Sequence, residues 1–286
     1  MVLCAVIALC VAAAGAKRSG DIPLPAVPAE LREPQARADY IIEHFWEPAD
    51  SLGDYSRTAI EQAFSNFISV FPLATEPSQT AAVKALMAKA AKSHDDYALI
   101  AEIADTYLYS TDSPVESEDY YIMFLREIVD SPVLDDDEKI RPSFQLANAL
   151  KNRPGDLAAD FPFITRDGVQ STLYGAIDAM KDKSPAKILL VLYDPDCGHC
   201  RRTMDALVKL PAVTDGSVAV IAVFSGDDMD EWLKTAQNLP ENWIVGFEDG
   251  TMLEEGAYVV RTFPSIYIIS PEKIVVEKEA SLESLR

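Results

Sequence analysis

The sequence predicts an α/β domain, with a mixed central sheet and covering helices, preceded by an all-α helical domain. In the first half of the chain, apolar residues recur at helical spacing, as Ala38, Ile42 and Phe45 do. In the second half, apolar runs that fit buried strands alternate with helix patterns, which favours a mixed sheet between helices. One of these runs, Ile188–Tyr193, is apolar throughout and predicts a strand buried on both faces.

The first sixteen residues have the features of a signal peptide. Val2–Ala14 is an apolar run too short to span a bilayer, and Ala14, Gly15 and Ala16 form a small-x-small cleavage pattern before Lys17. The basic residue that such a segment ordinarily carries near its start is missing. We expect residues 1–16 to be removed on export, which leaves no stable membrane insertion.

The next segments are a lead-in and the helical domain. Residues 17–33 contain three prolines and are expected to be extended. Residues 34–151 are expected to form six helices joined by short turns, with Pro142 inside the sixth. The expected N-caps of the third, fourth and fifth helices are, in order, Ser78, Asp95 or Asp96, and Ser117. Aromatic residues at helical spacing are more often core than ligand groove, so we assign no chemistry to this domain.

Asn152–Gly155 breaks the helical pattern and marks the start of the α/β domain, residues 152–286. Its expected elements are, in order, a hairpin near Ala159–Gly168, a helix carrying Leu173, Ile177 and Met180, the strand Ile188–Tyr193, a helix over Arg201–Leu210, the strand Val218–Phe224, a helix over Met229–Asn238, and strands at Trp243–Phe247, Ile266–Ile269 and Ile274–Val276.

Two cysteines, Cys197 and Cys200, remain once the signal peptide is removed. They follow Ile188–Tyr193 at the expected carboxyl end of the strand, where open α/β sheets place their chemistry. The first cysteine is expected at the amino terminus of the next helix, where unpaired N–H groups and the helix dipole favour a thiolate. Two cysteines with this spacing can close and reopen a small disulfide ring, which indicates a redox switch.

A zinc site is the rival interpretation of the pair. It needs two further ligands, and the chain contains three histidines, His44, His94 and His199. We therefore expect no metal and no cofactor, and a metal chaperone is the least favoured function. The chain has 25 basic and 46 acidic residues, a net charge of −21, which argues against nucleic acid or an anionic membrane as a partner.

The strand, the tetrad Cys197-Gly198-His199-Cys200 and the helix follow one another as in the thioredoxin superfamily, which this region resembles. A second match is Arg261–Ser265, where Pro264 precedes an apolar strand as the superfamily's cis-proline does. Ala159–Phe163 resembles the opening of a TlpA-like hairpin. The resemblance implies an α/β thioredoxin-like domain and a thiol–disulfide oxidoreductase. It also implies that Cys197 attacks, Cys200 resolves the mixed disulfide, and a cis Pro264 faces the pair.

The whole chain resembles a family of bacterial envelope proteins in which an uncharacterised helical domain precedes a TlpA-like domain, on stretches such as Arg37–Trp46 and Tyr193–Cys200. This implies a periplasmic or other envelope location, protein thiol or disulfide substrates, and a membrane or periplasmic redox partner. The second hypothesis is an envelope binding or adaptor protein with a redox-inert thioredoxin-like scaffold. The sequence ends within Ser281–Arg286, before the final helix usual in such domains, which is consistent with truncation.

The tetrad also departs from thioredoxin. Its Gly-His dipeptide is that of disulfide isomerase-like domains, and His199 can place positive charge near the first thiolate, which lowers the pKa of that thiol. Asp196 stands where thioredoxin has an aromatic residue, and with Asp194 it opposes thiolate formation. Val191 stands where thioredoxin carries a buried acid. The candidates for accepting the proton of Cys200 are therefore water, His199 or a group that the sequence does not locate.

Overall fold

The structure is a computed structural model that describes residues 17–18, 20–181 and 184–285. The expected signal peptide, residues 1–16, lies outside the described residues. Within the described part, no helix is long and apolar enough to cross a membrane. The chain divides into two compact units, one up to Ser143 and one from Phe144, and the division falls inside a helix. A boundary at residues 151 and 152 stays a prediction.

The first unit is helical. Residues 17–33 run without a helix, and Ile22 within them is buried. The six helices expected for this region are present, α3 packs against α1, α4 and α5, and a single π-helical turn, Asp105–Tyr109, extends α4. The helices are α1 (Pro34–His44), α2 (Arg57–Val70), α3 (Glu76–Ala90), α4 (His94–Ala104), α5 (Glu118–Asp130) and α6 (Asp136–Ala149), which continues into the second unit.

The aromatic residues at helical spacing form the core of the first unit. Phe64, Phe67 and Phe124 are fully buried, and the rings of Phe64 and Phe124 lie 5.4 Å apart between centroids. Pro142 lies inside α6, as expected. The aromatic pattern of the sequence therefore marks packing between helices.

Two of the expected helix caps are wrong. The α3 helix begins at Glu76, because Pro77 fits its first turn, and Ser78 is buried inside it. The α4 helix is capped by Ser93, whose hydroxyl accepts the N–H of Asp96 at 3.4 Å, so Asp95 and Asp96 lie in the first turn. Acidic residues in a first turn favour a helix through its dipole, which explains why the pattern pointed to them. The expected cap of α5, Ser117, is confirmed.

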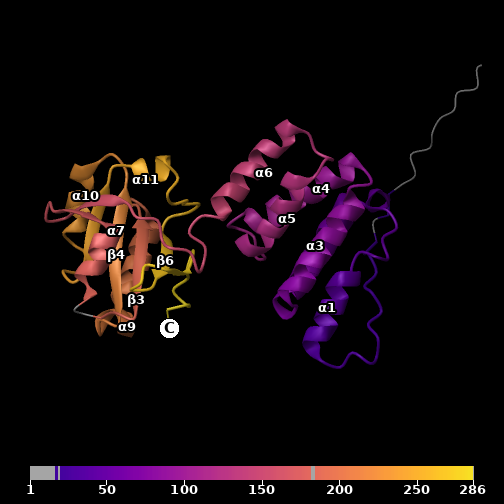
Figure 1. The fold of residues 1–286 in the computed structure, drawn as a ribbon, viewed down its shortest axis with the longest axis horizontal. Helices are drawn as coiled ribbons and strands as arrows, with labels where there is room; N and C mark the ends of the chain where they lie inside the picture. The colour runs from indigo at the N-terminus through magenta and orange to yellow at the C-terminus, as the bar shows by residue number, and fades with distance from the viewer. Residues whose placement is uncertain (1–16, 19, 182–183, 286) are drawn as a thin grey trace, which may run out of the picture. The chain divides into compact units, whose positions relative to one another are not determined.

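The second unit is built on a seven-stranded mixed sheet with the strand order β2-β1-β5-β4-β3-β6-β7. Figure 1 labels three of these strands, β3, β4 and β6. Strands β3, β4 and β5 are mutually parallel, and the others pair antiparallel. Its elements are β1 (Pro162–Thr165), β2 (Gln170–Thr172), α7 (Leu173–Ala179), β3 (Lys187–Tyr193), α8 (Gly198–Leu207), α9 (Pro211–Thr214), β4 (Val218–Ser225), α10 (Met229–Ala236), β5 (Ile244–Glu248), α11 (Thr251–Glu254), β6 (Ser265–Ile269) and β7 (Val275–Glu277).

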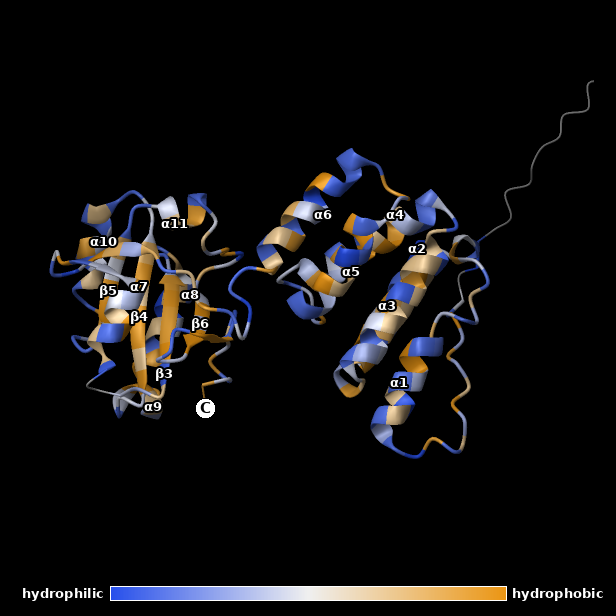
Figure 2. Ribbon diagram, in the orientation of Figure 1, coloured by the Kyte–Doolittle hydropathy of each residue, from blue (hydrophilic) through white to orange (hydrophobic). Residues whose placement is uncertain are grey.

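The strand predicted from Ile188–Tyr193 is β3, which lies between β4 and β6 inside the sheet. Its side chains alternate between two apolar clusters, and α8, α9 and α10 cover one face while α7 and α11 cover the other. Figure 2 shows the strands β3, β4 and β6 as hydrophobic ribbon. The predicted fold class, an all-α domain followed by an α/β domain with a mixed sheet, is confirmed. The short helices α9 and α11 were not predicted, because four residues are too few for a helical period.

Candidate functional site

The cysteine pair lies where β3 ends and α8 begins. Cys197 is the N-cap of α8, and its sulfur accepts the backbone N–H of Cys200 at 3.2 Å. The turn before it is held by Asp194, whose carbonyl accepts the N–H of Cys197 at 3.2 Å and whose Oδ1 accepts the N–H of Asp196 at 2.7 Å. The prediction that Cys197 stands at a helix amino terminus is confirmed.

Cys197 has the electrostatic surroundings of a nucleophilic thiol. Burial raises its pKa, but hydrogen bonds from the thiol and the N–H of Cys200 and from the N–H of His199 hold the pKa below its usual value. The charge of Asp194 acts in the opposite direction. Cys197 is half-buried, so a thiolate there is open to attack on a substrate.

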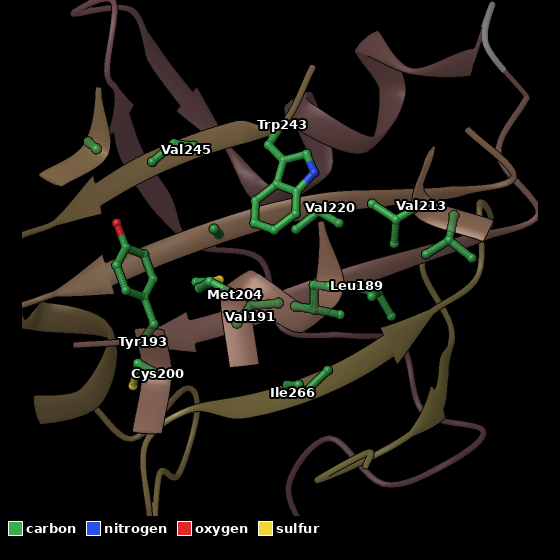
Figure 3. Close-up of a cluster of buried hydrophobic side chains, with 14 of the residues drawn as sticks. Leu189, Val191, Tyr193, Cys200, Met204, Val213, Val220, Trp243, Val245 and Ile266 are labelled. Carbon is green, nitrogen blue, oxygen red and sulfur yellow. The ribbon is translucent and has the colours of Figure 1, made fainter. Parts of the chain in front are cut away.

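Cys200 has the opposite surroundings. It is 1% exposed, in an apolar cluster with Val191 and Met204 that Figure 3 shows. Burial raises the pKa of Cys200 to about 12; the backbone of Asp194 lowers it, while the neighbouring Cys197 and the charge of Asp194 add to the rise. Val191, at the position where the sequence comparison placed the missing acid, lies on this face of β3. The pair thus joins an accessible low-pKa thiol to an enclosed thiol that holds its proton.

The segment before β6 faces the pair from a distant part of the chain. The Phe263–Pro264 peptide bond is cis, as the resemblance implies, and the Cys197 thiol donates to the Phe263 carbonyl at an S···O distance of 3.7 Å. The sheet brings these residues together, because β6 pairs antiparallel with β3 and Ser265 lies opposite Leu192. The backbone of Phe263 therefore lies beside the Cys197 sulfur.

His199 acts on Cys197 through its backbone. Its side chain is exposed, and its N–H, with the thiol and N–H of Cys200, lowers the pKa of Cys197. Unpaired N–H groups were expected to favour a thiolate at this helix terminus, and the N–H of His199 is one of them. The imidazole charge of His199, also expected to lower this pKa, is not among the causes of the shift.

Trp232, which lies in the helix expected over Met229–Asn238, is a further residue beside the site. Its indole Nε1 donates to the hydroxyl of Tyr193 at 3.1 Å, which ties α10 to the last residue of β3. Both side chains are buried. In the described part of the chain, no group of three or more His, Cys, Asp or Glu residues is arranged to hold a metal ion.

Comparisons with known proteins agree with this architecture. Residues 11–152 match the model of a domain of unknown function, DUF5106. The crystal structure of a thioredoxin-like protein from Bacteroides caccae matches with a TM-score of 0.85 and 26% identity, and the match covers 94% of this chain and 97% of that protein. No curated protein matches the sequence.

Two further solved structures match a smaller part of the chain. A conserved protein of unknown function from Bacteroides fragilis is 31% identical, with 46% of this chain and 96% of that protein covered and a TM-score of 0.41. The thioredoxin domain of a thiol-disulfide oxidoreductase from Bacteroides vulgatus is 20% identical, with 46% and 92% covered and a TM-score of 0.39.

The sheet order, the cysteine pair at the start of α8 and the match over nearly the whole chain define a thioredoxin-like protein. It carries a DUF5106 domain ahead of its thioredoxin-like domain. The resemblance stated from the sequence, a helical domain followed by a thioredoxin-like domain, is confirmed.

Proposed function

We propose that the protein is an exported thiol–disulfide oxidoreductase that exchanges electrons with protein thiols and disulfides through Cys197 and Cys200. The observation that carries the proposal is the opposite shift of the two thiols: the pKa of the half-buried Cys197 is lowered and that of the buried Cys200 is raised. A low-pKa accessible thiol begins exchange, and an enclosed neighbour completes it.

The chemistry assigned to each residue follows from its place. The thiolate of Cys197 attacks a substrate disulfide and forms a mixed disulfide, which Cys200 then resolves to give the Cys197–Cys200 disulfide and a reduced substrate. The reverse sequence oxidises a substrate dithiol. The Phe263 carbonyl, within 3.7 Å of the Cys197 sulfur, is positioned to accept an N–H from an extended substrate chain.

We further propose that the chain works in the periplasm or another part of the cell envelope, with protein substrates and a membrane or periplasmic redox partner that restores the pair. The apolar run Val2–Ala14 with its small-x-small pattern supports export, and an oxidising compartment suits a working disulfide. Expression in a bacterium with an envelope and mass measurement of the recovered protein tests this, since cleavage leaves a chain that starts at Lys17.

The exchange activity is tested with insulin reduction and with trapping of mixed disulfides. Cys200→Ser leaves Cys197 able to attack but not to be released, so we expect it to accumulate covalent adducts with disulfide substrates that a thiol reductant removes. Cys197→Ser is expected to trap none. Cys197→Ser is thus the matched control, because it makes the same substitution at the other cysteine of the pair. A wild-type protein that exchanges with no disulfide favours the adaptor hypothesis, in which the thioredoxin-like domain is a scaffold.

A further inference from the structure

The second half of the exchange needs a proton acceptor for Cys200. The thiol must lose its proton before it can attack the mixed disulfide, yet burial holds its pKa at about 12. The β3 residue on the same face, Val191, is apolar and cannot take the proton. A group outside the strand must therefore do so.

A cavity of about 250 Å³ opens beside Cys200 at the end of β3. Cys200 lines it together with Asp194 from the turn and Arg201 and Asp205 from α8, and Asn238 follows α10 on the opposite side. The cavity has room for several water molecules, and its polar lining supplies the partners that such waters need. The cavity thus lies between the buried sulfur of Cys200 and the carboxylates of Asp194 and Asp205.

Of the groups around the cavity, Asp194 is the one suited to accept the proton. Tyr193 has its pKa raised to about 12 by burial, so it is a neutral phenol, and its hydroxyl already accepts from Trp232. Arg201 is cationic and donates to the Pro195 and Asp196 carbonyls, and Asp205 is exposed at the rim.

Asp194 differs from these groups in its reach to both sulfurs. Its charge contributes to the pKa values of both Cys197 and Cys200. Arg166 is a further charged group nearby. Its guanidinium donates hydrogen bonds to four backbone carbonyls, which stabilise its charge; they are those of Ala236, Leu239, Pro240 and Trp243. Thr235 and Asn238 carry no charge.

We propose that Asp194 accepts the proton of Cys200, directly or through water in this cavity, as Cys200 attacks the mixed disulfide. The inference rests on the proposed thiol–disulfide exchange. In the step, the S–H bond of Cys200 breaks and its proton passes to the Asp194 carboxylate. A bond forms between the Cys200 and Cys197 sulfurs, and the bond from Cys197 to the substrate sulfur breaks. The electron pair leaves on that sulfur, so the substrate is reduced and the dithiol is oxidised.

The test separates the two halves of the exchange with a chromogenic aromatic disulfide, in the full chain carrying Cys4→Ser and Cys10→Ser. Attack by Cys197 releases the first aromatic thiol, and attack by Cys200 on the mixed disulfide releases the second, so stopped-flow absorbance shows two phases. Asp194→Asn is expected to slow the second phase by at least about tenfold near pH 7, since general base catalysis is worth about 10²- to 10⁴-fold. The difference in second-phase rate between Asp194→Asn and the wild-type protein becomes smaller as pH rises, because hydroxide then deprotonates Cys200.

The matched control is Asp196→Asn. It removes the same charge two residues along the turn, but Asp196 is exposed and does not line the cavity. Both variants should speed the first phase, because each removes negative charge near Cys197, while only Asp194→Asn should slow the second. Asparagine keeps an oxygen that can accept the Asp196 N–H, so the turn is retained in Asp194→Asn.

Three results overturn the inference and leave the proposed function standing. A second phase in Asp194→Asn that equals the wild-type phase at every pH removes Asp194 from the step. An equal slowing in Asp196→Asn shows a general charge effect, and a larger slowing in Asp205→Asn assigns the proton to the rim carboxylate. If the wild-type protein gives no second phase, the proposed function fails together with the inference. This result therefore differs from the three that overturn the inference alone.

Discussion

Selective alkylation of the two cysteines measures the opposite pKa shifts. At pH 7, a pKa of about 12 leaves about 10⁻⁵ of Cys200 as thiolate, while a pKa below 9.0 leaves at least about 10⁻² of Cys197. Thiolate fraction therefore favours Cys197 by about 1,000-fold. The thiolate with the lower pKa is also the weaker nucleophile, and for a pKa difference of three units this reduces the advantage of Cys197 by about 15- to 30-fold. We expect Cys197 to react with iodoacetamide at least about 30 times faster than Cys200, and burial of Cys200 adds to this ratio.

The assay is a time course of alkylation of the reduced full chain, with the modified cysteine located by tandem mass spectrometry. The ratio has a definite pH dependence. Below the pKa of Cys197 both thiolate fractions rise tenfold per pH unit, and above it that of Cys197 levels off while that of Cys200 continues to rise. The ratio should therefore fall once the pH exceeds the lowered pKa of Cys197. Denatured protein is the control, since both thiols then react at similar rates. Equal labelling in the folded protein, or faster labelling of Cys200, would refute the assignment of roles.

Three further outcomes follow from the described contacts. His199→Pro removes one of the N–H groups that lower the pKa of Cys197, so the reduced form loses stability and the pair becomes more reducing in a glutathione redox buffer. Arg166→Met leaves four carbonyls without their guanidinium donor and should lower the free energy of unfolding by about 2–4 kcal/mol in urea denaturation. Residues 152–286 should unfold cooperatively without residues 34–151, as calorimetry of the isolated fragment would show.

Each of these has its control. For His199→Pro the control is His199→Ala, which keeps the N–H and removes the imidazole. If His199→Ala shifts the redox equilibrium as much as His199→Pro does, the effect belongs to the side chain. If His199→Pro shifts nothing, the nearby aspartates already offset the effect of His199 on the Cys197 thiolate. Lys209→Met, at an exposed position, is the control for Arg166→Met, and equal stability of the two variants contradicts the role given to the guanidinium. If residues 144–286 fold and residues 152–286 do not, the boundary lies inside α6.

Local patterns in the sequence determined much of the architecture. The unbroken apolar run Ile188–Tyr193 predicted an interior strand, and β3 is that strand, because only a strand covered on both faces can bury every side chain. The position of Cys197 was predictable for a similar reason, since a helix terminus is set by residues within one turn. The cap of α4 is Ser93 and not Asp95 or Asp96, because a cap depends on backbone angles that the pattern does not contain.

The chemistry of the pair depended on tertiary structure. The resemblance pointed to Pro264, but the carbonyl beside Cys197 is that of Phe263, 66 residues away in the sequence, and the pairing of β6 with β3 places it there. Likewise, sequence comparison showed that Val191 is not an acid, and only the packing of α8 and α10 against the end of β3 reveals a cavity shared by Cys200 and Asp194. The physical reason is that the pKa of a thiol depends on its burial and on nearby charges and N–H groups, and segments distant in sequence supply the burial.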